Sequence, residues 1–480
     1  MTDTNAVATG RTATRDARLV AALIASKVAG NAIRRMGRGG GTAAPGLVAE
    51  RLDPGLLRKL TSQLGEGAVV VAGTNGKTTT TRMIADVFEA VPWRVVHNRS
   101  GSNLVRGVIA AFIQRASLLG SIGGDIGVIE ADEAALPELV RRVQPRVLLL
   151  NNLFRDQLDR YGELDTIAKT WRAMLQDLPA DATVVVNGDD PTLVAITDGI
   201  RARRVCFGLN EEKHRLDALP HAADAAICRV CGADLGYHAL YVSHLGDWYC
   251  TGCGRARPAL DYVGSTIELH GVTSLSMRIG EAADGDHDIQ IGVPGLYNAY
   301  NALAAAAVSR EAGVSWDVLT GAFDAFRSAF GRIERLTYRG RELTLALVKN
   351  PTGFNEVLRM LTAETGGLQL PTMIAINDLD ADGRDVSWLW DVDFELLAKG
   401  EGTLSTSGLR GADMANRLKY AGVDVARIHQ LDTDVSTALD AFVEAIPEGE
   451  GGYILPTYTA MLALRKTLAE RGAVTEFWEQ

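Results

Sequence analysis

The sequence predicts an α/β protein in which a phosphate-binding domain with a four-cysteine insert precedes a second, Rossmann-like α/β domain. Short apolar runs such as VVVA and RVLLL alternate with helical stretches, as in a parallel sheet covered by helices. The turn AGTNGKTTTT follows the first of these runs, and two Cys-x₂-Cys pairs interrupt the pattern within residues 205–262. The alternation stops near SAFGRIERL and resumes with LTLALV, TMIAI and GYILP. We therefore expect an N-terminal helix and linker (1–50), a central domain (51–330) and a C-terminal domain (331–480).

Composition narrows the class of protein. The 480 residues are 47% apolar and 22% charged, which is enough apolar sequence for two or three cores. A net charge of −10 disfavours a nucleic-acid partner, because such proteins usually carry a basic surface for phosphates. The first residues lack the apolar core of a signal peptide, and no apolar run is long enough to span a membrane. We expect a cytoplasmic protein in which cysteines stay reduced.

Residues 17–38 predict an amphipathic helix. Apolar residues recur at helical spacing, and arginines gather toward its end before the breaker GRGGG. Two interpretations stay open at this point. The helix either packs on the next domain or lies on an anionic membrane surface.

The segment VVVAGTNGKTTTT predicts a nucleotide-binding loop between a buried strand and a helix. Lys77 is placed to reach the β- and γ-phosphates, the Thr78 hydroxyl to bind Mg²⁺, and backbone N–H groups to face the phosphates. The spacing is shorter than the standard P-loop, since Val71 stands where the first glycine is expected. The predicted nucleotide contacts are Gly73, Thr74, Asn75, Gly76, Lys77, Thr78 and Thr79.

GTNGKTTT resembles the Mur ligase superfamily, and further segments match it in order. They are DIGVIEADEA, NNLFRDQLDRYGELDTIAKTW, YNAYNALAAAA, GRIERL and VKNPTGFNEVL. The resemblance implies ATP-dependent phosphorylation of a carboxylate and attack on the acyl phosphate by an amine. Lys77, Glu130 and Arg332 would be placed near the moving phosphoryl group, where charge must be neutralised.

The resemblance also implies individual roles. Glu130 would bind Mg²⁺ with Thr78, Lys169 would be carbamylated beside a second Mg²⁺, and Asn298 and Asn301 would lie near the adenine. Two positions depart from the family pattern. Gln157 replaces a metal-binding His, and Ala346 replaces a ribose-binding Asp.

The cysteine insert predicts a structural zinc site. Cys228 and Cys231 are separated by eighteen residues from the pair Cys250 and Cys253, a spacing typical of a four-cysteine zinc ribbon. Four thiolates leave no open coordination position, so the expected ion is structural Zn²⁺. Cys206 is expected to be a packed core residue rather than a nucleophile.

The stretch NDLDADGRDVSWLWDVDFE (377–395), together with the cysteine insert, resembles the MurT family, the Mur-ligase-like subunits of lipid II isoglutaminyl synthases. The resemblance implies amidation of the D-glutamate α-carboxylate of lipid II with ammonia from a GatD-like glutaminase. It also implies that Asp385 completes the Cys–His pair of that partner. The remaining aspartates are expected to solvate a loop or cap a helix, and Trp388 and Trp390 would share a face if they lay on a strand.

About seventy residues precede the phosphate loop, fewer than the nucleotide-sugar domain of Mur ligases that act on UDP-linked precursors. A lipid-linked acceptor, reached at the inner face of the cell membrane with peripheral contact by the N-terminal helix, is therefore expected. Two alternatives remain. One is a stand-alone ligase of the folylpolyglutamate type, and the other is an assembly protein whose phosphate loop works as a switch.

Overall fold

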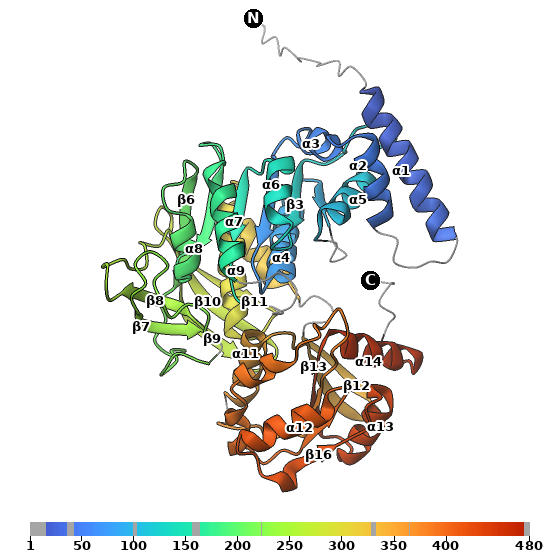
Figure 1. Ribbon diagram of the computed structural model, residues 1–480, viewed down its shortest axis with the longest axis vertical. Coiled ribbons are helices and arrows are strands. Elements are labelled where there is room, and N and C mark those ends of the chain that lie inside the picture. The colour runs from blue at the N-terminus through green and yellow to red at the C-terminus, as the bar shows by residue number, and fades with distance from the viewer. Residues whose placement is uncertain are drawn as a thin grey trace, which may run out of the picture.

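The computed structural model describes residues 16–35, 43–98, 103–155, 164–221, 223–327, 333–363 and 365–474. Figure 1 shows two sheets with their own helices, the C-terminal one below the central one, and the helix α1 on an outer edge. No helix of the described residues is long and apolar enough to cross a membrane.

A nine-stranded sheet forms the central part, in the order β11-β10-β9-β6-β5-β4-β1-β3-β2. The strands from β2 to β9 pair in parallel, and β9, β10 and β11 pair antiparallel. The bounds are β1 Ala68–Ala72, β2 Val95–His97, β3 Ile126–Glu130, β4 Val147–Leu150, β5 Thr183–Asn187, β6 Arg203–Leu209, β9 Tyr262–His270, β10 Ser274–Glu281 and β11 Gly285–Ile291.

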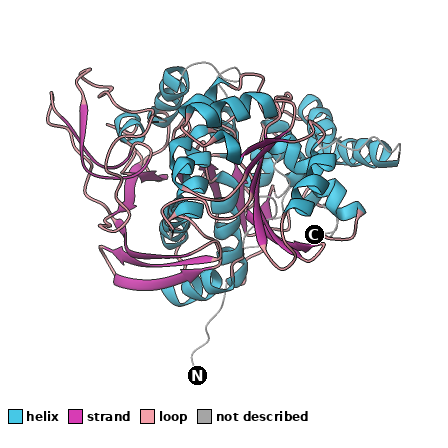
Figure 2. Ribbon diagram, turned by 90° about the horizontal axis from the view of Figure 1, so that it is seen from below, coloured by secondary structure: helices cyan, strands magenta, loops and turns pink. Residues whose placement is uncertain are grey.

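Helices cover both faces of this sheet, as Figure 2 shows. Val69 and Val71 of β1 pack into one core with α4, α9 and α10, while Val70 packs into the other with α1, α2, α3, α5, α6, α7 and α8. β1 is buried on both faces, which explains its unbroken apolar sequence. The helices are α1 Ala17–Arg35, α2 Ala43–Leu52, α3 Leu56–Thr61, α4 Lys77–Ala90, α5 Val105–Arg115, α6 Leu136–Val143, α7 Leu164–Gln176, α8 Pro191–Ile196, α9 Leu296–Glu311 and α10 Trp316–Ala325.

The cysteine insert adds a separate antiparallel pair of strands, β7 (Leu235–Val242) and β8 (Leu245–Cys250). Tyr241 and Leu245 join the core of the central sheet. The buried indole of Trp248 donates a hydrogen bond to the carbonyl of Gly188 at 3.0 Å. The insert is therefore packed against the central domain.

A six-stranded sheet forms the C-terminal part, in the order β12-β13-β17-β14-β15-β16. Only the β12–β13 pair is antiparallel among these described strands. One face packs on α11, α12 and two 3₁₀ helices, and the other face packs on α13 and α14. The bounds are β12 Ile333–Tyr338, β13 Arg341–Ala346, β14 Thr372–Ala375, β15 Leu404–Ser407, β16 Ile428–Gln430, β17 Gly451–Pro456, α11 Pro351–Thr362, η1 Ser387–Asp391, η2 Phe394–Lys399, α12 Gly411–Tyr420, η3 Val425–Arg427, α13 Val435–Ala445 and α14 Tyr458–Glu470.

The structure tests two local interpretations of the sequence, the helix at residues 17–38 and the placement of Trp388 and Trp390. The predicted helix at residues 17–38 is confirmed as α1 over Ala17–Arg35, and residues 36–38 lie outside the described part. Trp388 and Trp390 do not lie on a strand, the case in which they would share a face, because both lie in the 3₁₀ helix η1. With about three residues per turn, positions two apart point in different directions. Trp388 is buried beside Phe354, and Trp390 is 52% exposed.

Candidate active site

The phosphate loop joins β1 to α4 and is fixed by two asparagines that follow β4. The N–H of Thr74 donates to the carbonyl of Asn152 at 3.1 Å. Asn75 donates its N–H to Asn152 Oδ1 at 2.8 Å and accepts from Asn152 Nδ2 at 3.0 Å. The N–H groups of Thr74 and Asn75 are thus engaged by Asn152, and these bonds hold the loop that leads into α4.

Gly76 caps α4 in the left-handed region, with φ of 80°. A Cβ at this position would lie 2.0 Å from Asn301 Oδ1, so no side chain fits. Asn301 is 2% exposed and accepts hydrogen bonds from Thr80 Oγ1 and Asn151 Nδ2, both at 3.1 Å. Asn301 also donates to Asn298 Oδ1 at 2.9 Å. Asn301, held by Asn298, therefore packs against Gly76 of the phosphate loop. The predicted place of both asparagines near the adenine stays a prediction.

Lys77 forms a buried ion pair that the sequence analysis missed. Its Nζ lies 3.0 Å from Glu133 Oε1 and donates to the carbonyl of Thr74 at 3.2 Å. The Lys77 and Glu133 side chains are only 9% and 4% exposed. The carbonyl of Glu133 also accepts the indole N–H of Trp171 at 2.9 Å. Glu133 follows Glu130 by three residues in IEADEA. Its place in this acidic segment at the end of a strand was the only hint in the sequence that it lies near the phosphate loop.

Glu130 ends β3, next to the phosphate loop. Its register partner on β1 is Val71, and its backbone exchanges two hydrogen bonds with the Asn98 amide, at 2.9 and 3.0 Å. The side chain is buried and accepts a long hydrogen bond of 3.4 Å from Asn103 Nδ2. Thr78 is half-buried in the first turn of α4. A carboxylate and a hydroxyl beside a phosphate loop are oxygen donors of the kind Mg²⁺ prefers, so these residues fit the ion.

The other residues that the sequence singled out do not line the phosphate loop in this structure or lie outside the described residues. Lys169 lies on α7 and is exposed. Arg332 and Gln157 lie outside the described residues. Ala346 is buried at the end of β13. The predicted roles of Lys169 and Arg332 stay predictions.

The C-terminal part contacts the phosphate loop directly. Asn350 Nδ2 donates to Asn75 Oδ1 at 2.8 Å, while Asn350 Oδ1 caps α11 by accepting from the N–H of Gly353, also at 2.8 Å. The segment KNPTG is a typical helix start, with an N-cap residue before proline. The sequence therefore signalled the cap but not its contact with the loop.

A buried polar cluster fixes the turn after β5. Asp189 accepts hydrogen bonds from the Tyr300 hydroxyl (2.7 Å), the Leu209 N–H (2.9 Å) and the Arg257 guanidinium (3.0 Å). Complete burial nevertheless raises the pKa of Asp189 to about 6. Asp190 accepts the Leu153 N–H at 2.9 Å, which holds the segment that follows β4.

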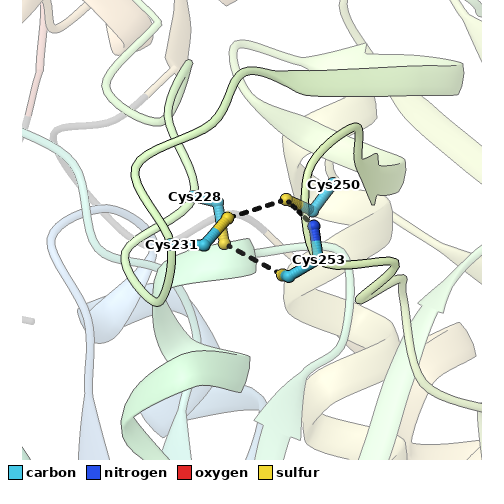
Figure 3. A group of neighbouring side chains, drawn as sticks. All are labelled: Cys228, Cys231, Cys250 and Cys253. Carbon is cyan, nitrogen blue, oxygen red and sulfur yellow. Dashed lines mark hydrogen bonds between the residues drawn. The ribbon is translucent and has the colours of Figure 1, made fainter.

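The four cysteines of the insert converge, as Figure 3 shows. The Cys228 and Cys253 sulfurs lie 3.8 Å apart, and those of Cys231 and Cys250 lie 3.4 Å apart. Four thiolates at about 2.3 Å from a tetrahedral zinc are about 3.8 Å from one another, so the cluster fits the ion.

Backbone donors favour the thiolate form of Cys250. The N–H groups of Cys253 and Gly252 donate to the Cys250 sulfur at 3.4 Å and lower the pKa of Cys250 to about 6. Outside the cluster, burial raises the pKa of Cys206 to about 11. The prediction that Cys206 is a packed core residue is confirmed.

The acidic segment forms a loop that is anchored at Asp382 and exposed at Asp385. Asp382 is buried and accepts the Thr459 N–H at 2.8 Å at the start of α14. Of the two expected roles it therefore caps a helix rather than solvating a loop, although α14 is not the helix that follows it. Asp385 is exposed, and its Oδ1 accepts the Ser387 N–H at 2.8 Å. That hydrogen bond holds the pKa of Asp385 below its usual value. Asp385 therefore presents an ionised carboxylate at the surface.

Comparisons with known proteins fit this arrangement. The Mur ligase middle domain matches residues 71–231, and the MurT ligase C-terminal domain matches residues 347–461. The structure of a pseudomurein peptide ligase type C from Methanothermus fervidus superposes with a TM-score of 0.66 at 16% identity, covering 87% of this chain and 80% of that one. The fold and the phosphate loop thus define the class as Mur ligase.

Two curated relatives specify the family. The lipid II isoglutaminyl synthase subunit MurT of Streptococcus pneumoniae is 34% identical over 456 residues, covering 94% of this chain and 97% of the relative. The subunit MurT of Staphylococcus aureus (strain COL) is 32% identical over 430 residues, covering 88% and 93%. The chain belongs to the MurT family.

Proposed function

We propose that the chain is the ligase subunit of a lipid II isoglutaminyl synthase. It would use ATP to convert the α-carboxylate of D-glutamate in the stem peptide to an amide, with ammonia from a GatD-like glutaminase. The observation that carries the proposal is the likeness to MurT subunits over 94% of the chain. It is combined with a phosphate loop that the C-terminal part contacts through Asn350 and Asn75.

The chemistry needs positioning and charge neutralisation rather than a protein nucleophile. A carboxylate oxygen of the substrate attacks the γ-phosphorus of ATP, and ADP leaves. The nitrogen of ammonia then attacks the acyl carbon, and phosphate leaves with the carbonyl restored. Lys77 and the N–H groups at the start of α4 would stabilise the transferring phosphoryl group. Thr78 and Glu130 would hold Mg²⁺, which supplies further positive charge, with Arg332 and a carbamylated Lys169 assigned supporting roles by the family pattern.

The C-terminal part would bind the glutaminase through the acidic loop. Asp385 is exposed and ionised, as an acid must be if it is to orient a histidine of another chain. Large apolar side chains are exposed on the same loop and on the elements bonded to it. These are Leu379 (43%), Leu409 (54%), Tyr458 (43%) and Leu462 (41%). Exposed apolar groups around a functional polar residue are typical of a protein interface.

The insert would hold structural Zn²⁺ as a ribbon, and the C-terminal domain would be Rossmann-like. We assign residues 51–330 to the ATP-binding domain, 331–480 to the domain that contacts the glutaminase, and 1–50 to a helix that reaches the membrane. The reaction would occur in the cytoplasm at the inner face of the membrane, where the lipid-linked substrate is exposed.

Reconstitution tests the proposal. The chain is purified with a co-encoded glutaminase-like protein and supplied with ATP, glutamine and lipid II. Mass spectrometry should show replacement of one carboxyl by an amide, with one ADP formed per amide. Lys77→Ala should stop the reaction, and Lys466→Ala, at an exposed lysine of α14, should not. ADP formation without amide would indicate a switch, and joining of an amino acid without the partner would indicate a stand-alone ligase.

A further inference from the structure

Helix α1 has two apolar faces, and only one of them is covered. Leu19, Ala22, Leu23 and Ser26 are buried against α2, α3 and α5. The opposite side is formed by residues spaced three or four apart, which places them on one stripe of the helix. This outer stripe consists of Ala17, Ala21, Ile24, Val28 and Ala32, all exposed. Ile24 is 45% and Val28 61% exposed.

A second exposed apolar element lies beside the outer stripe. The turn after α5 carries Leu118 and Leu119, which are 53% and 62% exposed. The turn abuts α1, because a Cβ at Gly120 would lie 3.2 Å from Leu19 Cδ2 and 4.0 Å from Val20 Cγ2. On a helix of 3.6 residues per turn, Val20 lies between the buried face and the outer stripe. Leu118 and Leu119 therefore border the outer stripe.

Basic groups surround these apolar side chains. Lys27 lies on the same side of α1 as the leucine turn and donates to the Gln114 carbonyl at 3.3 Å. Arg115 is exposed at the end of α5, and Arg18 is exposed on the opposite flank of the outer stripe. The acids nearby are paired, since Asp16 and Asp53 contact Lys59, and Glu50 contacts Arg106.

The charge of this region is opposite to that of the chain. Residues 1–60 contain ten Lys and Arg against four Asp and Glu, whereas the whole chain has 49 against 59. The net charge is therefore +6 for residues 1–60 and −16 for the remainder, which together give −10. A second copy of the same basic face would be repelled, and an anionic surface would be attracted. Exposed apolar side chains flanked by basic ones are typical of helices that bind anionic lipid.

We propose that the outer stripe of α1 and the Leu118–Leu119 turn together dock the enzyme on an anionic phospholipid surface. The proposal rests on the proposed function, because a lipid-linked substrate is reached only at a membrane. It goes beyond that function by naming the side chains that insert into the lipid. Ile24, Val28, Leu118 and Leu119 would enter the boundary between headgroups and acyl chains, while Lys27, Arg18 and Arg115 would contact lipid phosphates.

Vesicle binding tests the proposal with the complex of the chain and its glutaminase. Wild-type complex should sediment with vesicles of phosphatidylglycerol and phosphatidylcholine, and less so as salt is raised. Ile24→Ser/Val28→Ser and Leu118→Ser/Leu119→Ser should each reduce partitioning roughly tenfold or more, since each removes two inserted apolar groups. Val425→Ser is the matched control, because Val425 is 61% exposed on η3 of the C-terminal part. The control should bind as the wild type does.

Amidation assays separate this proposal from the proposed function. In detergent micelles the two double variants should amidate lipid II at the wild-type rate, and in vesicles they should be slower. Loss of amidation by the wild type in micelles would contradict the proposed function alone. Equal vesicle binding by wild type and both double variants, or equal binding to purely zwitterionic vesicles, would overturn the docking proposal. So would a wild-type dimer that Val28→Ser dissociates, because the outer stripe would then be covered by a second copy.

Discussion

The ion pair of Lys77 with Glu133 yields a prediction that joins stability to function. The two side chains are 9% and 4% exposed, and the atoms Nζ and Oε1 are 3.0 Å apart. Lys77→Met keeps the length of the side chain and removes its charge, which leaves a carboxylate buried without this cation. Breaking one partner of a buried pair costs about 3–5 kcal/mol, so we expect the free energy of unfolding to fall by about that amount.

A double-mutant cycle isolates the pair. Glu133→Gln alone should also destabilise, whereas Lys77→Met/Glu133→Gln removes both charges and should recover a large part of the loss. Urea unfolding, followed by circular dichroism, gives the three differences. Activity should separate the two residues. Lys77→Met should abolish amidation with either glutamine or ammonia, whereas Glu133→Gln should retain part of it.

Two outcomes would refute this reasoning. One is a Lys77→Met variant that unfolds at the wild-type urea concentration. The other is a double variant whose loss of unfolding free energy equals the sum of the two single losses, because such losses add when two residues do not interact.

Three further predictions concern other parts of the site. Asn301→Ala removes the acceptor of the Thr80 hydroxyl and one of the two acceptors of Asn151 Nδ2, so it should cost about 1–3 kcal/mol and weaken ATP binding, measured by calorimetry. Cys253→Ser should lower bound zinc, measured by elemental analysis, whereas Cys206→Ser should leave it unchanged. Asp189 binds a proton more tightly in the folded state, with a pKa of about 6 against 3.8, so its ionisation costs stability as pH rises from about 4 to 6. Asp189→Asn should therefore destabilise less at pH 7 than at pH 4.5, by about 2 kcal/mol in urea unfolding, and an equal loss at both pH values would contradict the shift.

Features set by neighbouring residues were predictable from the sequence. The strand, loop and helix around Lys77, the helix α1 and the pairing of the two cysteine motifs depend on local spacing. The site contacts missed by the sequence join distant positions. Lys77 and Glu133 are 56 residues apart, and Asn75 and Asn350 are 275 apart. The residues around each of these positions do not indicate which distant loops and strand ends will come together in the fold.

The acidic loop shows the same limit. Its aspartates look alike in the sequence, yet Asp382 is buried because α14, whose Thr459 lies 77 residues further on, supplies the N–H that it accepts. The spacing of the two tryptophans did not show whether they lie on a strand; they lie in the 3₁₀ helix η1, from which Trp388 packs on Phe354 of α11. Tertiary packing decided both cases.

The role of Asp385 is the central claim, and one ratio tests it most directly. The rates of lipid II amidation with glutamine and with free ammonia are measured for the wild-type complex, Asp385→Asn and the control Asp380→Asn, whose carboxylate is exposed on the same loop and paired with Arg384. We predict that Asp385→Asn lowers the glutamine-dependent rate on the order of 10³–10⁴-fold, as expected for a triad acid, and leaves the ammonia-dependent rate unchanged. An unchanged glutamine-dependent rate, or an equal loss of both rates, would contradict the account.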